Sequence, residues 1–161
     1  MGGSVTVSQL SSLSDAELCA RTLYGECLDN FESIKAVAWC IINRQTLNVL
    51  GNAYYNKSYS QILLAPSQFV GLTGTNTAWK EEQGRNPVIN STKWKRSVEI
   101  AKLMVLYKGN RAILGDAITN PIDRRRYFLE KNYYIKYPAS YRMNPIMIDD
   151  NTFFHWKGEG Y

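Results

Sequence analysis

The chain has 161 residues, of which 45% are hydrophobic and only five are proline, so we expect one domain over residues 13–161 after a flexible tail over residues 1–12. Nineteen Lys and Arg against fourteen Asp and Glu give a net charge of +5, which suits an anionic partner such as nucleic acid, a membrane surface or an acidic cell wall. Four Trp, eleven Tyr and five Phe suit either core packing or a sugar-binding cleft.

The first predicted element is a helix with a strong start signal. Ser14 suits the N-cap position and Glu17 is its capping-box partner, which predicts a helix over residues 15–24. Gly25 is expected to end this helix, because glycine enters the left-handed C-terminal conformation without steric cost. Glu26 would then lie just past the helix end.

The second predicted helix is a core helix over residues 32–44. Its apolar residues recur at helical spacing, and they are Ile34, Val37, Ala38, Ile41 and Ile42. A polar stretch follows up to Ser58. A short helix is then expected over residues 59–64, ended by Pro66.

The second half of the chain changes character. Residues 67–89 lack periodicity and are expected to be mostly loop, and Ser91 suits the cap of a further helix that ends at Gly109. Two aromatic-rich segments, 126–129 and 152–156, have the composition of short strands. We therefore predict an α+β fold, mainly helical, with a small late β-sheet beside a cleft.

Cysteine and histidine usage argues against metal chemistry. Cys19, Cys27 and Cys40 are odd in number and lack metal-binding spacing, so buried thiols are expected. His155 is the single histidine, so the chain cannot build a multi-histidine site. We expect no metal and no cofactor.

Glu26 has neighbours that could hold its proton near neutral pH. A carboxylic acid protonates a glycosidic oxygen only if partial burial in apolar surroundings raises its pKa. Tyr24, Leu28 and Phe31 offer such contacts. An acidic residue after a helix is nevertheless most often a solvated surface group, so this pattern alone does not indicate catalysis.

A longer string gives Glu26 a functional interpretation. The chain reads Ala20-Arg21-Thr22-Leu23-Tyr24-Gly25-Glu26, then Ala36-Val37-Ala38-Trp39-Cys40-Ile41-Ile42-Asn43-Arg44, then Pro66-Ser67-Gln68-Phe69, and later Tyr127-Phe128. These motifs resemble those of the SleB-type cell wall hydrolases, the spore cortex-lytic enzyme family. The resemblance covers roughly residues 13–156, and the first thirty of these residues carry most of its specificity.

The resemblance implies a lysozyme-like fold in which Glu26 is the catalytic acid and then base on a muramic acid glycoside of peptidoglycan. A two-carboxylate glycosidase would need a second carboxylate. Asp29 and Glu32 are expected to face solvent, and the family's second glutamate is missing here. A single-acid lytic transglycosylase that forms 1,6-anhydro ends therefore fits better. If water attacks instead, the enzyme is a muramidase.

Further residues are candidates for substrate binding. Gln68 and Phe69 would line the glycan groove, although a loop anchor with a buried ring is an equal alternative for Gln68 and the favoured one for Phe69. Tyr127 and Tyr24 are aromatic candidates for the same groove. Asn43 and Arg44 would either buttress the Glu26 segment by hydrogen bonds or simply form the C-terminal end of the helix predicted over residues 32–44.

Two rival interpretations remain open. A catalytically silent wall-binding domain would keep the groove and lose the chemistry. The run Arg124-Arg125-Arg126, expected to be solvated, is compatible with nucleic acid binding, but no recognised nucleic-acid motif accompanies it. His155 is expected to be a strand residue.

The expected location is the cell wall, the spore coat or cortex, or delivery by a phage. We see no signal peptide and no run of about eighteen apolar residues that would span a membrane, and we expect a monomer.

Overall fold

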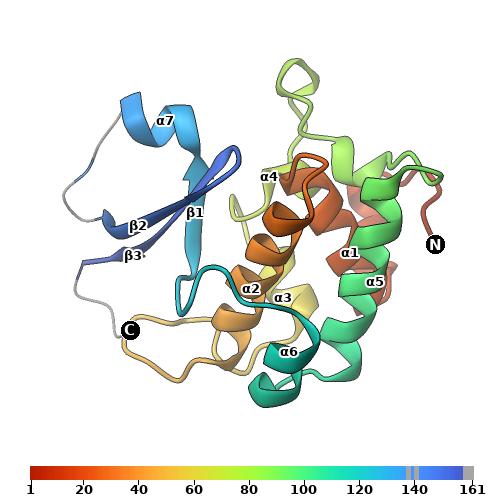
Figure 1. Ribbon diagram of the computed structural model, residues 1–161. Helices are drawn as coiled ribbons and strands as arrows, with labels where there is room; N and C mark the ends of the chain where they lie inside the picture. The colour runs from red at the N-terminus through yellow and green to blue at the C-terminus, as the bar shows by residue number, and fades with distance from the viewer. Residues whose placement is uncertain (137–138, 140–141, 158–161) are drawn as a thin grey trace.

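The computed structural model describes residues 1–136, 139 and 142–157, and it has the predicted α+β class with a mainly helical body and a small antiparallel sheet (Figure 1). The helices are α1 (Asp15–Glu26), α2 (Phe31–Thr46), α3 (Tyr59–Leu63), α4 (Val70–Thr73), α5 (Thr92–Leu106), α6 (Arg111–Ala117) and α7 (Lys131–Lys136). Short 3-10 turns are η1 (Val7–Ser12), η2 (Thr77–Trp79) and η3 (Gln83–Arg85). The strands are β1 (Tyr127–Glu130), β2 (Arg142–Ile148) and β3 (Asn151–Trp156).

Helix α1 begins as predicted and ends differently. The Ser14 side chain accepts a hydrogen bond from the Glu17 amide at 3.2 Å. The Glu17 carboxylate does not complete the predicted capping box and instead accepts hydrogen bonds from Arg21, from Nε at 3.1 Å and from Nη2 at 2.7 Å. The helix continues to Glu26, and Gly25 lies inside it without a positive φ. The prediction that Gly25 ends the helix in a left-handed conformation is therefore wrong.

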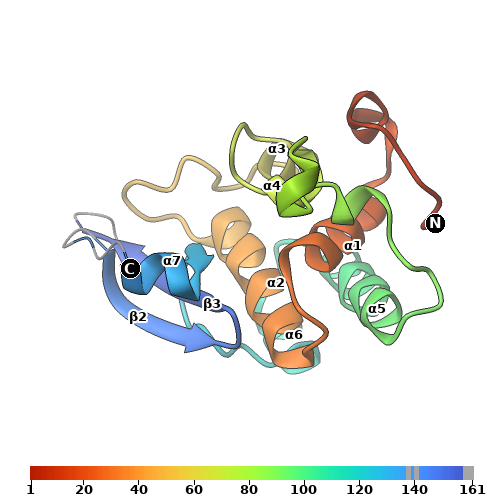
Figure 2. The same ribbon diagram turned by 90° about the horizontal axis from the view of Figure 1, so that it is seen from above.

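Helix α2 is the central element of the core. The Asn30 side chain caps it by accepting from the amides of Glu32 and Ser33. The predicted apolar face is buried, but so is every residue from position 36 to position 45. The helix runs to Thr46, two residues beyond the predicted end, because helices and the sheet surround it on several sides (Figures 1 and 2).

Residues 1–12, expected to be a flexible tail, lie against the helical body. Leu10 in η1 is buried. The Val5 amide donates to the Arg85 carbonyl at 3.1 Å, and Arg21 Nη2 donates to the Gly3 carbonyl at 2.5 Å. These bonds tie the N-terminal segment to α1 and η3.

The middle of the chain contains more helix than predicted. Helix α3 matches the expected short helix, and Ser91 caps α5 by accepting from the Trp94 amide at 3.1 Å. Helix α5 ends at Leu106, and Gly109 then turns the chain with a φ of 79°. The predicted loop 67–89 contains α4, η2 and η3, because single helical turns leave no periodic apolar pattern.

The two predicted strands pair with each other in the sheet. The strand order is β1-β3-β2, and Tyr127 lies opposite Phe154 in the antiparallel register of β1 and β3. The unpredicted edge strand β2 has an irregular register between Met143 and Ile146, with Asn144 at a φ of 51°. The sheet stands beside the helical body, close to α2 (Figures 1 and 2).

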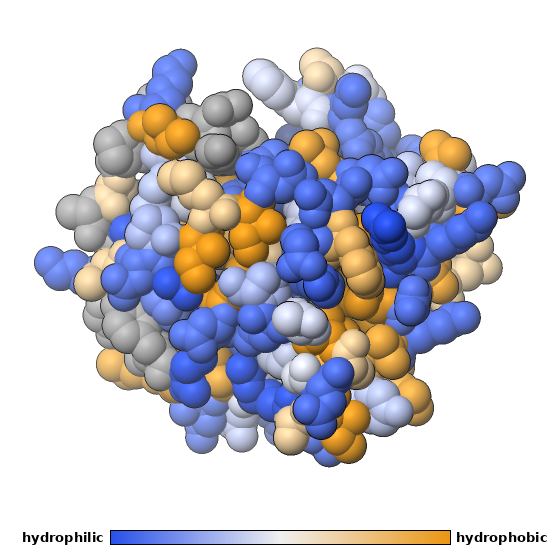
Figure 3. All heavy atoms as spheres, viewed as in Figure 1, coloured by the Kyte–Doolittle hydropathy of each residue, from blue (hydrophilic) through white to orange (hydrophobic). Residues whose placement is uncertain are grey.

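The surface of the described residues is mixed. On the face shown in Figure 3, apolar side chains reach the surface between the sheet and the helices, within largely hydrophilic surroundings. Among the described residues, no helix combines the length and the apolar character that crossing a membrane requires.

Candidate active site

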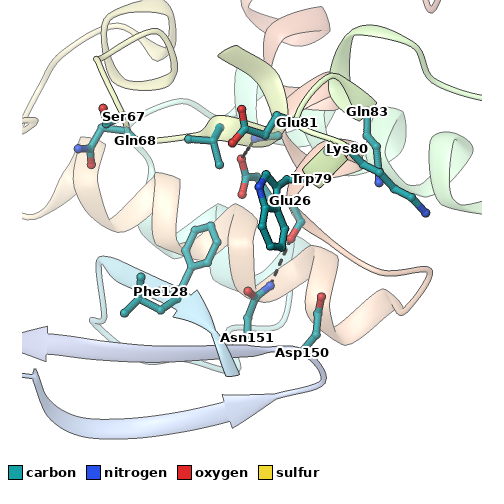
Figure 4. Close-up of a pocket in the computed structure, with 14 residues that line it drawn as sticks. Glu26, Ser67, Gln68, Trp79, Lys80, Glu81, Gln83, Phe128, Asp150 and Asn151 are labelled. Carbon is teal, nitrogen blue, oxygen red and sulfur yellow. Dashed lines mark hydrogen bonds between the residues drawn. The ribbon is translucent and has the colours of Figure 1, made fainter. Parts of the chain in front are cut away.

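A cavity of about 510 Å³ lies where the end of α1, the segment around α4 and the sheet meet (Figure 4). Its walls come from these three parts of the chain and from the loop that contains η2 and η3. They are lined by Gly25, Glu26, Ser67, Gln68, Val70, Gly71, Trp79, Lys80, Glu81, Gln83, Phe128, Leu129, Asp150 and Asn151. The cavity therefore combines polar groups with apolar and aromatic surface, as binding sites for organic ligands do.

Glu26 lies on the cavity wall at the last residue of α1. Its Oε1 accepts a hydrogen bond from the backbone amide of Gly71 at 2.7 Å, and its carbonyl accepts one from Asn151 Nδ2 at 3.2 Å. Both bonds appear as dashed lines in Figure 4. The residue is thereby held by α4 on one side and by the sheet on the other.

Close contact between glycine backbones brings the Gly71 amide within reach. A Cβ atom placed on Gly25 would overlap the Gly71 carbonyl and lie 3.0 Å from the Gly84 nitrogen. One placed on Gly71 would lie 2.5 Å from the Gly25 oxygen and 3.0 Å from Glu26 Oε1. Gly25 is therefore needed for the close packing of α1 against α4 and η3.

Burial changes the acidity of Glu26. Loss of solvent around the carboxyl group raises its pKa from 4.5 to about 7, and this effect outweighs the Gly71 amide and the charge of Arg44, which both favour the ionised form. A carboxyl group with this pKa is protonated in a large fraction of molecules at neutral pH. It can therefore donate a proton and later accept one.

Arg44 connects the walls of the site. Its Nη1 donates to Gln68 Oε1 at 3.0 Å, and its Nε donates to the Arg126 carbonyl at 2.7 Å. The guanidinium also lies 4.9 Å from the ring centroid of Phe69 and 5.2 Å from that of Tyr127. Arg44 thus orients Gln68 toward its place on the cavity wall and joins α2 to the start of β1.

Asn43 and Arg44 buttress a different segment from the one predicted. Asn43 Nδ2 donates to the carbonyls of Asp123 and Arg125 at 2.9 and 2.7 Å. With Arg44, it supports the chain that leads into β1, and none of the hydrogen bonds described for either side chain reaches the Glu26 segment. Both residues lie within the last turns of α2.

The structure brings only part of the predicted site together. Glu26 and Gln68 line the cavity, whereas Phe69, Tyr127 and Tyr24 do not. Phe69 is fully buried beneath Phe128. Tyr127 packs on the other side of β1, and the ring of Tyr24 packs edge-on against Trp94 on α5. Neighbouring residues point to opposite faces of a strand, so Phe128 takes the position that Tyr127 was expected to fill.

Several cavity residues were not predicted. Trp79, Glu81, Phe128, Asp150 and Asn151 reach the site from a loop, two strands and a tight turn. The aromatic content of the chain indicated that a cleft could be lined with rings, but it did not indicate which rings. Asp29 and Glu32 are exposed, as predicted.

The remaining chemical candidates lie away from the cavity. The three cysteines are buried and free, as expected. His155 is a strand residue, and burial together with Arg125 and Arg126 lowers its pKa to about 4. Arg126 is only 2% exposed, so the prediction of a solvated arginine run is wrong at this position. Among the described residues, no group of three or more His, Cys, Asp or Glu side chains is arranged to hold a metal ion.

Comparison of the chain with known protein families, with curated proteins and with solved structures finds no match.

Proposed function

We propose that this protein cleaves the glycan strands of peptidoglycan at the muramic acid glycosidic bond, with Glu26 as the catalytic acid and base. The observation that carries the proposal is a carboxyl group of pKa about 7 on the wall of a large open cavity. Structural ion-pair networks also perturb pKa values, but here the dominant cause is burial beside a ligand-sized space. The motif around Glu26 supports the choice of substrate.

The reaction needs two proton transfers by one group. Protonated Glu26 gives its proton to the glycosidic oxygen as the bond from the muramyl C1 to that oxygen breaks. The ionised carboxylate then takes the proton of the muramyl 6-hydroxyl group while the oxygen of that hydroxyl group attacks C1. The product is a 1,6-anhydro end, and Glu26 is protonated again. The bond from the Gly71 amide to Oε1 leaves Oε2 as the oxygen that carries the proton.

A hydrolytic outcome is the second candidate, and a specific observation favours it. Glu81 and Asp150 line the same cavity as Glu26, so the site contains further carboxyl groups of the kind that activate water in two-carboxylate glycosidases. Glu81 Oε2 accepts from the Asn76 amide at 2.8 Å, which holds its side chain in the loop. In this case the enzyme is a muramidase.

The test of the proposal is Glu26→Gln. The amide keeps the shape of the side chain and its acceptor for the Gly71 amide, but it cannot donate an acidic proton. We expect its rate of cleavage of purified peptidoglycan to fall about 10²–10⁴-fold. Glu32→Gln is the matched control, since Glu32 is exposed on the first turn of α2 and should leave the rate unchanged.

Mass spectrometry of the released muropeptides reports both rate and product. Equal activity of Glu26→Gln and wild type, or no activity in wild type, would contradict the proposal. Anhydro products are lighter than hydrolysed ones by one water molecule, so the same spectra separate a lytic transglycosylase from a muramidase. A wall-binding domain without catalysis would bind peptidoglycan and release nothing.

A further inference from the structure

Trp79 is the most exposed large hydrophobic side chain among the described residues. Its side chain lies at the end of η2, on the wall of the Glu26 cavity, and 78% of its surface is open to solvent. Within the part of the chain that the structure describes, its ring contacts no other aromatic ring. Leaving so much apolar surface in water is unfavourable, and a ring in this state at a cavity indicates a binding surface.

The loop that carries Trp79 is held by its own hydrogen bonds. The Asn76 amide donates to Glu81 Oε2 at 2.8 Å, and the Glu81 amide donates back to the Asn76 carbonyl at 3.2 Å. Asn76 Oδ1 also accepts from the Ala78 amide at 3.1 Å, and Lys80 turns the chain with a φ of 54°. These bonds close residues 76–81 on themselves, so the indole is presented to the cavity without being packed into the core.

A second ring reaches the cavity from the sheet. Phe128 on β1 is only partly buried, and behind it lie Phe153, at 5.4 Å between ring centroids, and Phe69, at 6.3 Å. Figure 4 shows the Trp79 indole, the Phe128 ring and the Glu26 carboxyl group around one space. One ring is thus supported by the core, while the other stands on a loop.

Polar groups accompany these rings. Gln83, Lys80 and Asn151 line the same cavity. A pyranose ring matches this arrangement, because its C–H faces are apolar and its hydroxyl groups project around its edge. The indole N–H of Trp79 also remains available as a donor to such a hydroxyl group.

We propose that Trp79 stacks on a sugar ring of the bound glycan and, with Phe128 on the sheet side of the same cavity, forms a sugar subsite next to Glu26. This inference rests on the proposed function, since it takes the glycan strand as the ligand. Trp79 is a binding residue in this scheme and takes no part in proton transfer.

The experiment measures binding in a background that does not cleave the ligand. The Glu26→Gln protein is titrated with glycan strands from which the peptide stems have been removed, and the dissociation constant is measured by calorimetry. Adding Trp79→Ala should weaken binding about tenfold or more, and Trp79→Phe should weaken it less, because the smaller ring still stacks. Tyr55→Ala is the matched control, since Tyr55 is a 44% exposed aromatic residue outside the cavity and should not affect binding.

Tryptophan fluorescence gives a second readout. Saturating glycan should shift the emission of the Glu26→Gln protein to shorter wavelength as the Trp79 indole leaves water, and this shift should be absent when Trp79 is replaced by Phe. Unchanged affinity in Trp79→Ala, or an unchanged shift in Trp79→Phe, would overturn the inference while leaving the proposed cleavage reaction intact. Absence of glycan binding by the Glu26→Gln parent would overturn it as well. Failure of the proposed function is read separately, from cleavage by wild type and Glu26→Gln.

Discussion

At the scale of single residues, the pKa of Glu26 results from opposing effects. Removal of solvent raises its pKa, whereas the Gly71 amide and the positive charge of Arg44 lower it. The balance near 7 leaves the carboxyl group able to exchange a proton in either direction at neutral pH. Stronger burial would keep it permanently protonated, and closer cations would keep it ionised.

The raised pKa predicts how stability depends on pH. Between pH 4.5 and about 7 the folded protein binds more protons at Glu26 than the unfolded chain, so ionisation of this group lowers the free energy of unfolding as the pH rises through that range. A shift of this size corresponds to about 3 kcal/mol. Partial solvent exposure reduces this, so we expect wild type to lose on the order of 2 kcal/mol relative to Glu26→Gln.

Urea unfolding of both proteins at several pH values from 4.5 to 8 measures this difference. The comparison cancels the titration of other groups, such as Glu17, whose pKa is lowered and whose contribution has the opposite sign. Parallel stability curves for the two proteins would show that the pKa of Glu26 is not raised.

At the scale of elements, the C-terminal end of α1 shows how a residue's role depends on its surroundings. Glycine inside a helix is unfavourable by roughly 0.5–1 kcal/mol relative to alanine. Gly25 occupies such a position because α1 meets the backbones of Gly71 and Gly84 there. The same contact supplies the amide that binds Glu26 Oε1.

Replacement of Gly25 by alanine should therefore destabilise the protein, although alanine has a higher helix propensity than glycine. The new Cβ atom would overlap the Gly71 carbonyl, and we expect the free energy of unfolding to fall by about 1–3 kcal/mol, together with a lower rate in the proposed cleavage reaction. Gly115→Ala in α6 is the matched control. A Cβ atom there meets nothing within 4 Å, so the variant should gain up to about 1 kcal/mol. Thermal unfolding measures whether each variant is more or less stable than wild type. A stabilised Gly25→Ala variant would refute the close contact between the Gly25 and Gly71 backbones.

At the scale of the whole molecule, the sheet and the helical body are joined through buried side chains of α2. Asn43 binds the carbonyls of Asp123 and Arg125 and accepts from Arg111 Nη1 at 2.6 Å. Arg44 adds its bond to the Arg126 carbonyl. The cavity lies between the parts that these bonds connect, so the position of its sheet wall depends on them.

Asn43→Ala should loosen this connection. It removes the donor to the Asp123 and Arg125 carbonyls and one of the acceptors of Arg111, which keeps its bond to Thr46, and we expect the free energy of unfolding to fall by about 2–4 kcal/mol. Asn48→Ala, at an exposed position just beyond α2, should change it by less than about 0.5 kcal/mol. The midpoints of urea unfolding compare the two, and equal midpoints would show that Asn43 does not support the sheet.

Several features could be predicted from the sequence because they depend on neighbours in the chain. Ser14 and Ser91 cap helices through amides three residues away, and the paired strands β1 and β3 follow their local composition. Strand β2 was missed because Asn144 and Pro145 interrupt its pattern at the irregular register.

The sequence by itself determined the fold class, the main helices and the one acidic residue worth testing, because capping, periodicity and motifs are short-range signals. Only the tertiary structure decided that Glu26 lies inside the last turn of α1, accepts a hydrogen bond from an amide 45 residues away and shares a cavity with Trp79 and Phe128. Burial, pKa and cavity shape depend on groups that the chain brings together from distant positions. A local sequence pattern therefore does not predict burial, pKa or cavity shape.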